Sequence, residues 1–104
     1  RVAVAQLVAG RSGDGGRYAL VQAACLGHLE VLRALLEVEV DPNHRDERGR
    51  TPLIIGAFRS NPAVCEVLLA HGADPGLVDS TGSSAWSVAD EKLRTVLQLY
   101  SALH

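Results

Sequence analysis

Hydrophobic and polar positions recur along the chain with a period of thirty-three residues. A shift by this period places apolar residues on apolar residues: Leu20 on Leu53 and Trp86, Ala23 on Gly56 and Ala89, Val31 on Val64 and Leu97, and Leu35-Leu36 on Leu68-Leu69. The same shift aligns turn residues: Asp41-Pro42 with Asp74-Pro75, Asp46 with Asp79, Thr51 with Ser84, and Gly16 with Gly49 and Gly82. A repeat of this length is the sequence signature of stacked supersecondary units.

Each repeat predicts a short helix, a tight turn, a longer helix and an extended loop that ends in Asp-x-x-Gly. Two apolar faces at helical spacing support the first unit: Leu20, Ala23 and Ala24, and then Val31, Leu32, Leu35 and Leu36. The second set has the i, i+1, i+4, i+5 spacing of a buried stripe. Gly27 separates the two helices. We therefore expect all of these apolar residues to be buried.

Helix boundaries are clearest in the second unit. Thr51 can cap a helix that has Pro52 at its first position, and Asn61 can cap the next helix with Pro62 following it. Gly72 then supplies a left-handed stop. The matching position in the first unit is Glu39, where left-handed backbone costs a residue other than glycine about 1 kcal/mol. We expect the first loop to be distorted at Glu39.

The two ends of the chain depart from the repeat. In the third unit the turn between the helices is absent, and the stretch from 84 to 104 continues as one polar-apolar pattern typical of a C-terminal cap. At the other end, VAVAQLVAG predicts a lone apolar helix, followed by a glycine-rich turn. We divide the chain into a leading helix and turn (1–12), two repeats (13–45 and 46–78) and a capping repeat (79–104).

These motifs together resemble the ankyrin repeat family. GRTPLIIGAF is similar to the family's G-x-TPLH-x-A-A pattern, AACLGHLEVLRALLE to its AAxxGHxxIVxxLL run, and LLAHGADPG to its LLxxGAD ending. The resemblance implies an all-α solenoid of helix-turn-helix units joined by extended finger loops. The histidine of TPLH is replaced by Val21, Ile54 and Ser87, so its hydrogen bonds to neighbouring loops cannot form.

Composition narrows the class of protein. A chain of 104 residues forms one small domain, and only 4% of its residues are aromatic, so the core must consist of small aliphatic side chains. A net charge of −2 gives no overall attraction to nucleic acid or membranes. No apolar run is long enough to cross a bilayer. Cys25 and Cys65 form no metal or disulfide motif and are expected to be reduced thiols.

Arg1 and the absence of methionine suggest a piece of a larger intracellular protein, cytoplasmic or nuclear. The loop GRSGDGGRY lacks the Gly-Lys-Ser/Thr of a phosphate-binding loop and is interpreted as a turn. The four histidines share no ligand spacing, so we expect no metal and no other cofactor. Every serine, aspartate and histidine has a role in the repeat, and we therefore predict no catalytic residues.

The polar segment DPNHRDERGR falls on the first finger of the repeat register. The resemblance implies that fingers and short helices form a concave binding face whose residues vary within the family. The predicted site consists of Arg45, Glu47, Arg48 and Arg50 on the first finger, Phe58 and Arg59 on the second short helix, and Val78 and Thr81 on the second finger. Ser80 and Ser83 also lie on the second finger, and the matching positions of the first unit are Arg17, Cys25 and Leu26.

Aromatic residues and arginines together are typical of interface hot spots. We therefore expect a non-catalytic protein-protein interaction module that binds a segment rich in acidic and apolar residues. Two alternatives remain. The chain could be a structural spacer or self-association element whose finger arginines only pair with Asp46 and Glu47. It could also contact nucleic acid through its arginines, although the net charge argues against this.

Overall fold

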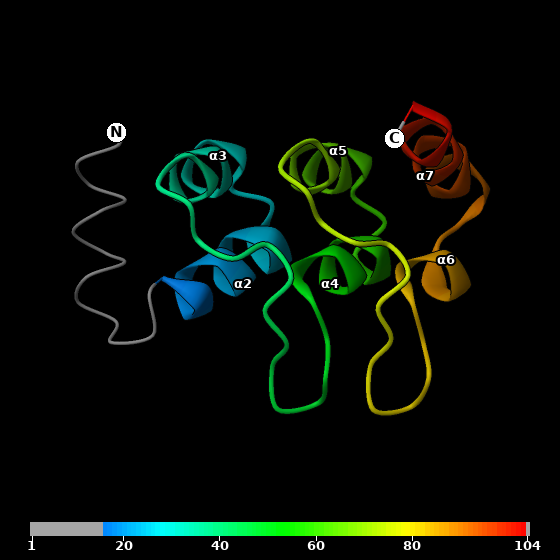
Figure 1. Ribbon diagram of the computed structural model, residues 1–104, viewed down its shortest axis with the longest axis horizontal. Helices are drawn as coiled ribbons and strands as arrows, with labels where there is room; N and C mark the ends of the chain where they lie inside the picture. Colours follow the sequence, from blue (N-terminus) through cyan, green and yellow to red (C-terminus); the bar gives the residue numbers. More distant parts are fainter. Residues whose placement is uncertain (1–15, 104) are drawn as a thin grey trace.

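The computed structural model describes residues 16–103, with side chains described for residues 16–100. The predicted leading helix and its turn lie outside the described residues. The described elements are α2 (Arg17–Leu26), α3 (Leu29–Glu37), α4 (Pro52–Phe58), α5 (Pro62–Ala70), α6 (Ala85–Val88) and α7 (Glu91–Leu103) (Figure 1). This arrangement confirms the all-α class that the hydrophobic periodicity predicts.

The helices form two layers (Figure 1). An inner layer contains α2, α4 and α6, and an outer layer contains α3, α5 and α7; neighbours within each layer are in contact. Two extended loops project side by side from the edge of the inner layer (Figure 1). We call residues 41–50 the first finger and residues 74–83 the second finger.

The predicted helix caps are confirmed. The Thr51 hydroxyl oxygen accepts a hydrogen bond from the Ile54 amide at 3.2 Å, and the Asn61 side-chain oxygen accepts one from the Val64 amide at 3.3 Å. Each bond satisfies an amide that the first turn of a helix leaves without a partner. A proline follows each cap at the start of α4 and α5.

The first helix of the first unit is not the shorter one, contrary to the prediction. α2 has ten residues and α3 has nine. In the repeat register Tyr18 stands where Thr51 caps α4, and a tyrosine ring cannot accept from the first-turn amides. The helix therefore continues back to Arg17, where Gly16 takes a left-handed conformation without a side-chain cap.

The predicted distortion at Glu39 is also wrong. Glu39 has φ of +64°, and Gly72 in the next unit has +93°. The amides that follow them donate equivalent bonds, Val40 to Leu35 O at 3.2 Å and Ala73 to Leu68 O at 3.0 Å. The two loops therefore leave their helices in the same way, and Glu39 accepts a strain of about 1 kcal/mol that a glycine would avoid.

The capping unit keeps two helices but shortens the first. α6 has four residues, Ala89 is extended, and the Asp90 side chain accepts from the Leu93 amide at 2.8 Å. Asp90 thus takes the capping place of Asn61 four residues earlier than the repeat period requires. The alignment of Leu97 with Val64 is therefore wrong, and Leu97 corresponds structurally to Leu68.

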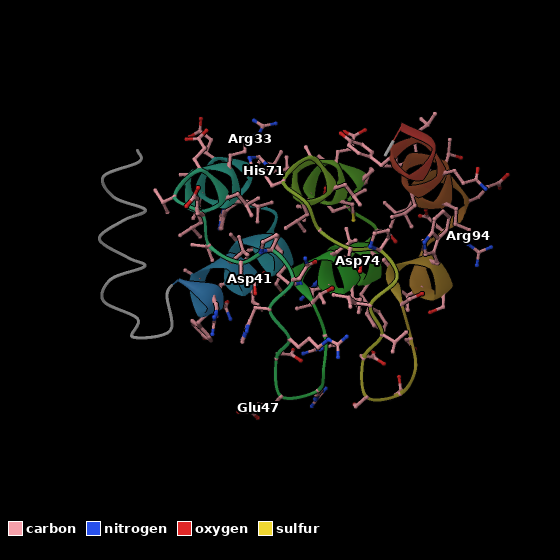
Figure 2. All side chains as sticks on the ribbon, in the orientation of Figure 1. Arg33, Asp41, Glu47, His71, Asp74 and Arg94 are labelled. Atoms are coloured by element: carbon pink, nitrogen blue, oxygen red, sulfur yellow. The ribbon has the colours of Figure 1, made fainter. Side chains whose placement is uncertain are left out.

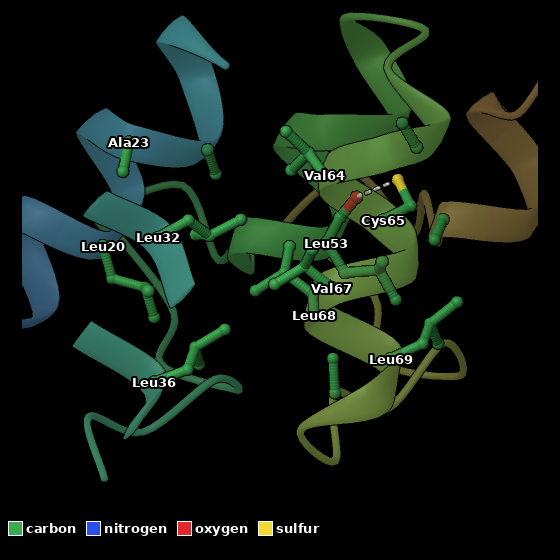
Figure 3. Packing of buried hydrophobic residues seen from close by; sticks show 14 of the residues in the cluster. Leu20, Ala23, Leu32, Leu36, Leu53, Val64, Cys65, Val67, Leu68 and Leu69 are labelled. Atoms are coloured by element: carbon green, nitrogen blue, oxygen red, sulfur yellow. Dashed lines mark hydrogen bonds between the residues drawn. The ribbon is translucent and has the colours of Figure 1, made fainter. Parts of the chain in front are cut away.

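Among the described residues, one apolar core runs between the two layers (Figure 3). The predicted core residues Leu35 and Leu68 are fully buried, and Leu36 and Leu69 are also buried. Val31 is a wrong prediction, because 49% of its surface is exposed. Its counterpart Val64 is fully buried because it packs over Gly56, where a Cβ would lie 2.9 Å from Val64 Cγ1.

Candidate partner-binding groove

Asp46 organises the tip of the first finger. Its Oδ1 accepts from the amides of Arg48 at 2.9 Å and Arg50 at 2.8 Å, and its Oδ2 accepts from Arg50 Nε at 3.0 Å. Partial burial alone would raise the pKa of Asp46, but the two amides and the Arg50 guanidinium outweigh it and lower the pKa below its ordinary value. The first finger is therefore built around a carboxylate that stays ionised.

Asp79 does the same for the second finger. Its Oδ1 accepts from the Thr81 hydroxyl at 2.7 Å and from the amides of Thr81 and Ser83 at 2.9 Å each. The Thr81 hydroxyl and then the Ser83 amide lower the pKa of Asp79. The two fingers thus share one backbone design, and both predicted turn-starting aspartates are confirmed.

The fingers are tied to each other at the tip. The Ser80 amide donates to Arg48 O at 2.8 Å. Gly49, at φ +77°, lies so close to the second finger that a Cβ there would be 2.9 Å from Ser80 N. Glycine is therefore required at this position by conformation and by space.

Asn43 ties the fingers together at their base. Its side-chain nitrogen donates to Gly72 O at 3.3 Å, and its side-chain oxygen accepts from the Asp74 amide at 2.7 Å. Figure 2 shows Asp41 and Asp74 at corresponding places on the two fingers. Sequence reasoning missed Asn43, because its partners lie in the following unit and the asparagine is not repeated there.

A groove of about 700 Å³ lies between the first finger and α2. We call it the finger–helix groove. Its lining residues are Arg17, Tyr18, Val21 and Gln22 from α2, and His44, Arg45, Asp46, Glu47, Arg48 and Arg50 from the first finger. The structure thus gathers the four predicted first-finger residues on one wall of the groove, with Arg17 on the opposite wall.

Sequence reasoning missed Tyr18, Val21, Gln22 and His44 as groove residues. Tyr18 is 66% exposed. A detectable signal was present, because Tyr18 stands where Thr51 caps the helix of the next repeat. An aromatic ring beside arginines supplies an apolar contact surface next to charge.

Positive charge predominates in the finger–helix groove. Arg50 is partly buried and its Nε lies 3.0 Å from Asp46 Oδ2, so its charge is largely balanced by Asp46 within the finger. Arg17, Arg45 and Arg48 are exposed and have no acidic partner in the part of the chain that the structure describes. Glu47 contributes the other lining carboxylate.

The remaining predicted residues lie outside this groove. Phe58 ends α4 and is 60% exposed, and Arg59 follows it. An Arg59 guanidinium nitrogen donates to Cys25 Sγ at 3.1 Å, which joins α4 to the end of α2, where Leu26 is also exposed. We call Cys25, Leu26, Phe58 and Arg59 the helix-end patch.

On the second finger the two predicted residues differ in exposure and bonding. Val78 is 43% exposed and forms a short antiparallel bridge with Ser84. Thr81 is committed to Asp79 and contacts Ser83 Oγ at 3.2 Å. The two predicted residues of the second finger therefore offer a partner fewer available polar groups than the arginines of the first finger.

The potential metal ligands, the buried cysteine and the helix lengths of the described region bear on other functions. Among residues 16–100, no three His, Cys, Asp or Glu residues are grouped to hold a metal ion. Burial, and then the neighbouring Glu66, raises the pKa of Cys65 to about 12; its Sγ lies 4.0 Å from Leu53 O (Figure 3). No described helix has the length and apolar character to cross a bilayer.

A family model described as "Ankyrin repeats (3 copies)" matches residues 3–79 of this chain. The match starts before the first repeat that the sequence pattern defines and stops where the capping unit begins. It includes the first finger, part of the second finger, and the helix pairs α2–α3 and α4–α5.

Several curated proteins are similar to this chain over part of its length. The chain is 44% identical over 68 residues to cyclin-dependent kinase 4 inhibitor B of Bos taurus. The matched region is 65% of this chain and 51% of that relative. It is 43% identical to SH3 and multiple ankyrin repeat domains protein 1 of Homo sapiens over 64% of this chain and 3% of the relative. It is 34% identical to protein phosphatase 1 regulatory subunit 12A of Mus musculus over 85% of this chain and 9% of the relative. The chain therefore spans about half or much less of these relatives.

Proposed function

The chain belongs to the ankyrin repeat family, and on this premise we propose that it is a non-catalytic protein-protein interaction module of a larger intracellular protein. In this proposal it binds a partner segment through the face made by the fingers and the inner helices. The observation that carries the proposal is the finger–helix groove, where three exposed arginines with no acidic partner among the described residues lie beside an exposed tyrosine. The names of two relatives describe a kinase inhibitor and a phosphatase regulatory subunit, and both descriptions fit binding to another protein.

The chemistry of this face favours a partner segment with acidic and apolar residues. Arg45 and Arg48 form no ion pair with the described residues and can attract carboxylates directly, whereas Arg50 would have to leave Asp46. Phe58 and Leu26, exposed at 60% and 63%, supply apolar surface in the helix-end patch. A segment that crosses the inner helices could contact the groove with its acidic part and the patch with its apolar part. Val78 and Thr81 form the border of this face on the second finger.

Selection of peptides from a random display library on the immobilised chain tests the proposal. We expect enriched peptides with acidic and apolar residues. Phe58→Ala should weaken their binding roughly thirtyfold, since an aromatic anchor contributes about 2 kcal/mol. Arg45→Gln should mainly slow association and reduce the salt dependence. Fluorescence anisotropy with the same peptides measures both effects.

Arg33→Gln provides the matched control. Arg33 is exposed on the outer layer, away from the fingers (Figure 2), and its substitution should leave binding unchanged. Binding that depends on Arg33 and not on Phe58 or Arg45 would place the interface on the outer helices. Failure of the library to enrich any peptide would favour a spacer. Tight binding of DNA or RNA with a steep salt dependence would favour the nucleic-acid alternative.

A further inference from the structure

The hydrogen bond that joins the two finger tips has no equivalent on the other side of the first finger among the described residues. Ser80 donates its amide to Arg48 O across the gap between the fingers. Glu47 is the residue of the first finger that corresponds to Ser80 in the thirty-three-residue register. Its amide has no acceptor among the described residues, and Glu47 lines the finger–helix groove. Figure 2 shows Glu47 at the tip of the first finger. The repeat geometry therefore directs an unused backbone donor toward the groove.

Of the four guanidinium groups that line the groove, three have no acidic partner among the described residues. Arg45 and Arg48 flank Glu47 on the finger, and Arg17 belongs to the opposite wall on α2. All three side chains are exposed and without an acidic partner in the described part of the chain. A backbone amide together with guanidinium groups is a combination that binds oxyanions, because hydrogen bonds to an ionised acceptor are stronger than neutral ones.

We propose that the Glu47 amide, with Arg17, Arg45 and Arg48, binds the side-chain carboxylate of an aspartate or glutamate in an extended partner segment. This inference rests on the proposed function and specifies how the groove recognises its partner. The carboxylate takes the place beside the first finger that Arg48 O takes beside the second finger. The exposed Tyr18 ring offers an apolar contact to a neighbouring residue of the same segment.

Charge in the groove does not by itself decide between a carboxylate and a phosphate group. Asp46 and Glu47 place two carboxylates on the same wall as the arginines. A phosphate ester carries a charge of about −1.5 to −2 at neutral pH, so the arginines attract it more strongly, and these carboxylates repel it more strongly, than a carboxylate of charge −1. The carboxylate is taken as the ligand because its two oxygens match planar guanidinium groups, and a phosphoserine peptide serves as the comparison.

The probe for the test is a short blocked peptide of alternating glutamate and leucine, compared with a counterpart in which glutamine replaces glutamate. Titration of the full chain, followed by amide resonances and by calorimetry, should show the glutamate peptide shifting the Glu47 amide. It should bind about tenfold more tightly than the glutamine peptide, equivalent to about 1.4 kcal/mol. Arg45→Gln should abolish most of this preference, and Arg33→Gln should retain it.

Two substitutions at one position isolate the backbone donor. The Gly49 amide bonds to Asp46 O at 2.9 Å and closes a four-residue turn in which Glu47 is the second residue, a position that favours proline. Glu47→Pro removes the side-chain carboxylate and the amide hydrogen, whereas Glu47→Ala removes only the carboxylate. Glu47→Ala should bind the glutamate peptide more tightly than the original chain, and Glu47→Pro should bind it several-fold more weakly than Glu47→Ala.

Three results would overturn this inference: equal binding of the glutamate and glutamine peptides, equal binding by Glu47→Pro and Glu47→Ala in proteins with unchanged circular dichroism, or binding of a phosphoserine counterpart in preference to the glutamate peptide. These results leave the proposed function in place if library peptides still bind and still depend on Phe58. A chain that enriches no library peptide contradicts the proposed function itself.

Discussion

The two fingers have the same backbone and different chemistry. Each is closed by an aspartate that accepts amides two and four residues ahead, and each has a left-handed glycine at the turn. The first finger presents arginines, whereas the second presents serines and a threonine whose hydroxyl bonds to Asp79. The difference shows that the repeat preserves the residues that shape a finger and varies those that it displays.

The comparison requires that both fingers be supported by one core. Leu68 is fully buried between the layers, and its truncation removes buried methyl groups and leaves a cavity. Leu68→Ala should lower the free energy of unfolding by about 2–5 kcal/mol. Val31→Ala, at a position that is 49% exposed, should cost less than about 1 kcal/mol. Denaturant titration measures both, and equal losses would show that the register is wrong.

Substitution of the two turn glycines tests the contact between the fingers. Gly49 and Gly82 both have positive φ, so alanine costs about 1–2 kcal/mol at either position. Only at Gly49 would a Cβ meet the other finger, at 2.9 Å from Ser80 N, whereas at Gly82 nothing lies within 4 Å. Gly49→Ala should therefore be the more destabilising change in thermal unfolding. The opposite order would mean that the fingers are not in contact in solution.

The two aspartates should give stability a dependence on acid pH. Both pKa values are lowered in the folded chain, so the stabilisation is complete above the ordinary value of 3.8 and is lost as pH falls through the lower folded pKa values. With Asp46→Asn or Asp79→Asn, the free energy of unfolding should decrease less as the pH is lowered into the acid range. Asp46→Asn should have the larger effect, because Asp46 is partly buried and also pairs with Arg50. Urea titrations between neutral and acid pH measure this difference.

The smallest expected effect on stability distinguishes Arg50, which is paired within the first finger, from the exposed Arg45. Arg50→Ala removes a partly exposed ion pair and should cost about 0.5 kcal/mol, with less effect at high salt. Arg45→Ala removes no protein contact that the structure shows and should leave the melting temperature unchanged. Scanning calorimetry at low and high salt tests the pair. A larger loss from Arg45 than from Arg50 would mean that the roles are reversed.

Local sequence determined the repeat, the caps and the core. The bonds of Thr51 and Asn61, the left-handed Gly72 and the burial of Leu35 and Leu68 each follow from residues within one unit. Caps, turns and apolar stripes depend on residues close together in the chain, so they can be predicted from the sequence of each repeat. The exposure of Arg45, Arg48 and Phe58 was predictable for the same reason.

Contacts between units were decided only by the tertiary structure. Asn43 bridges to Gly72 and Asp74, Gly49 leaves room for Ser80, and Val31 stays exposed while Val64 is buried over Gly56. The structure also decided that Arg50 is paired while Arg45 and Arg48 have no acidic partner among the described residues, and that Phe58 lies outside the finger–helix groove. These outcomes depend on distances between residues about thirty positions apart, which are set by how neighbouring units stack, whereas a repeat pattern specifies only what each unit contains.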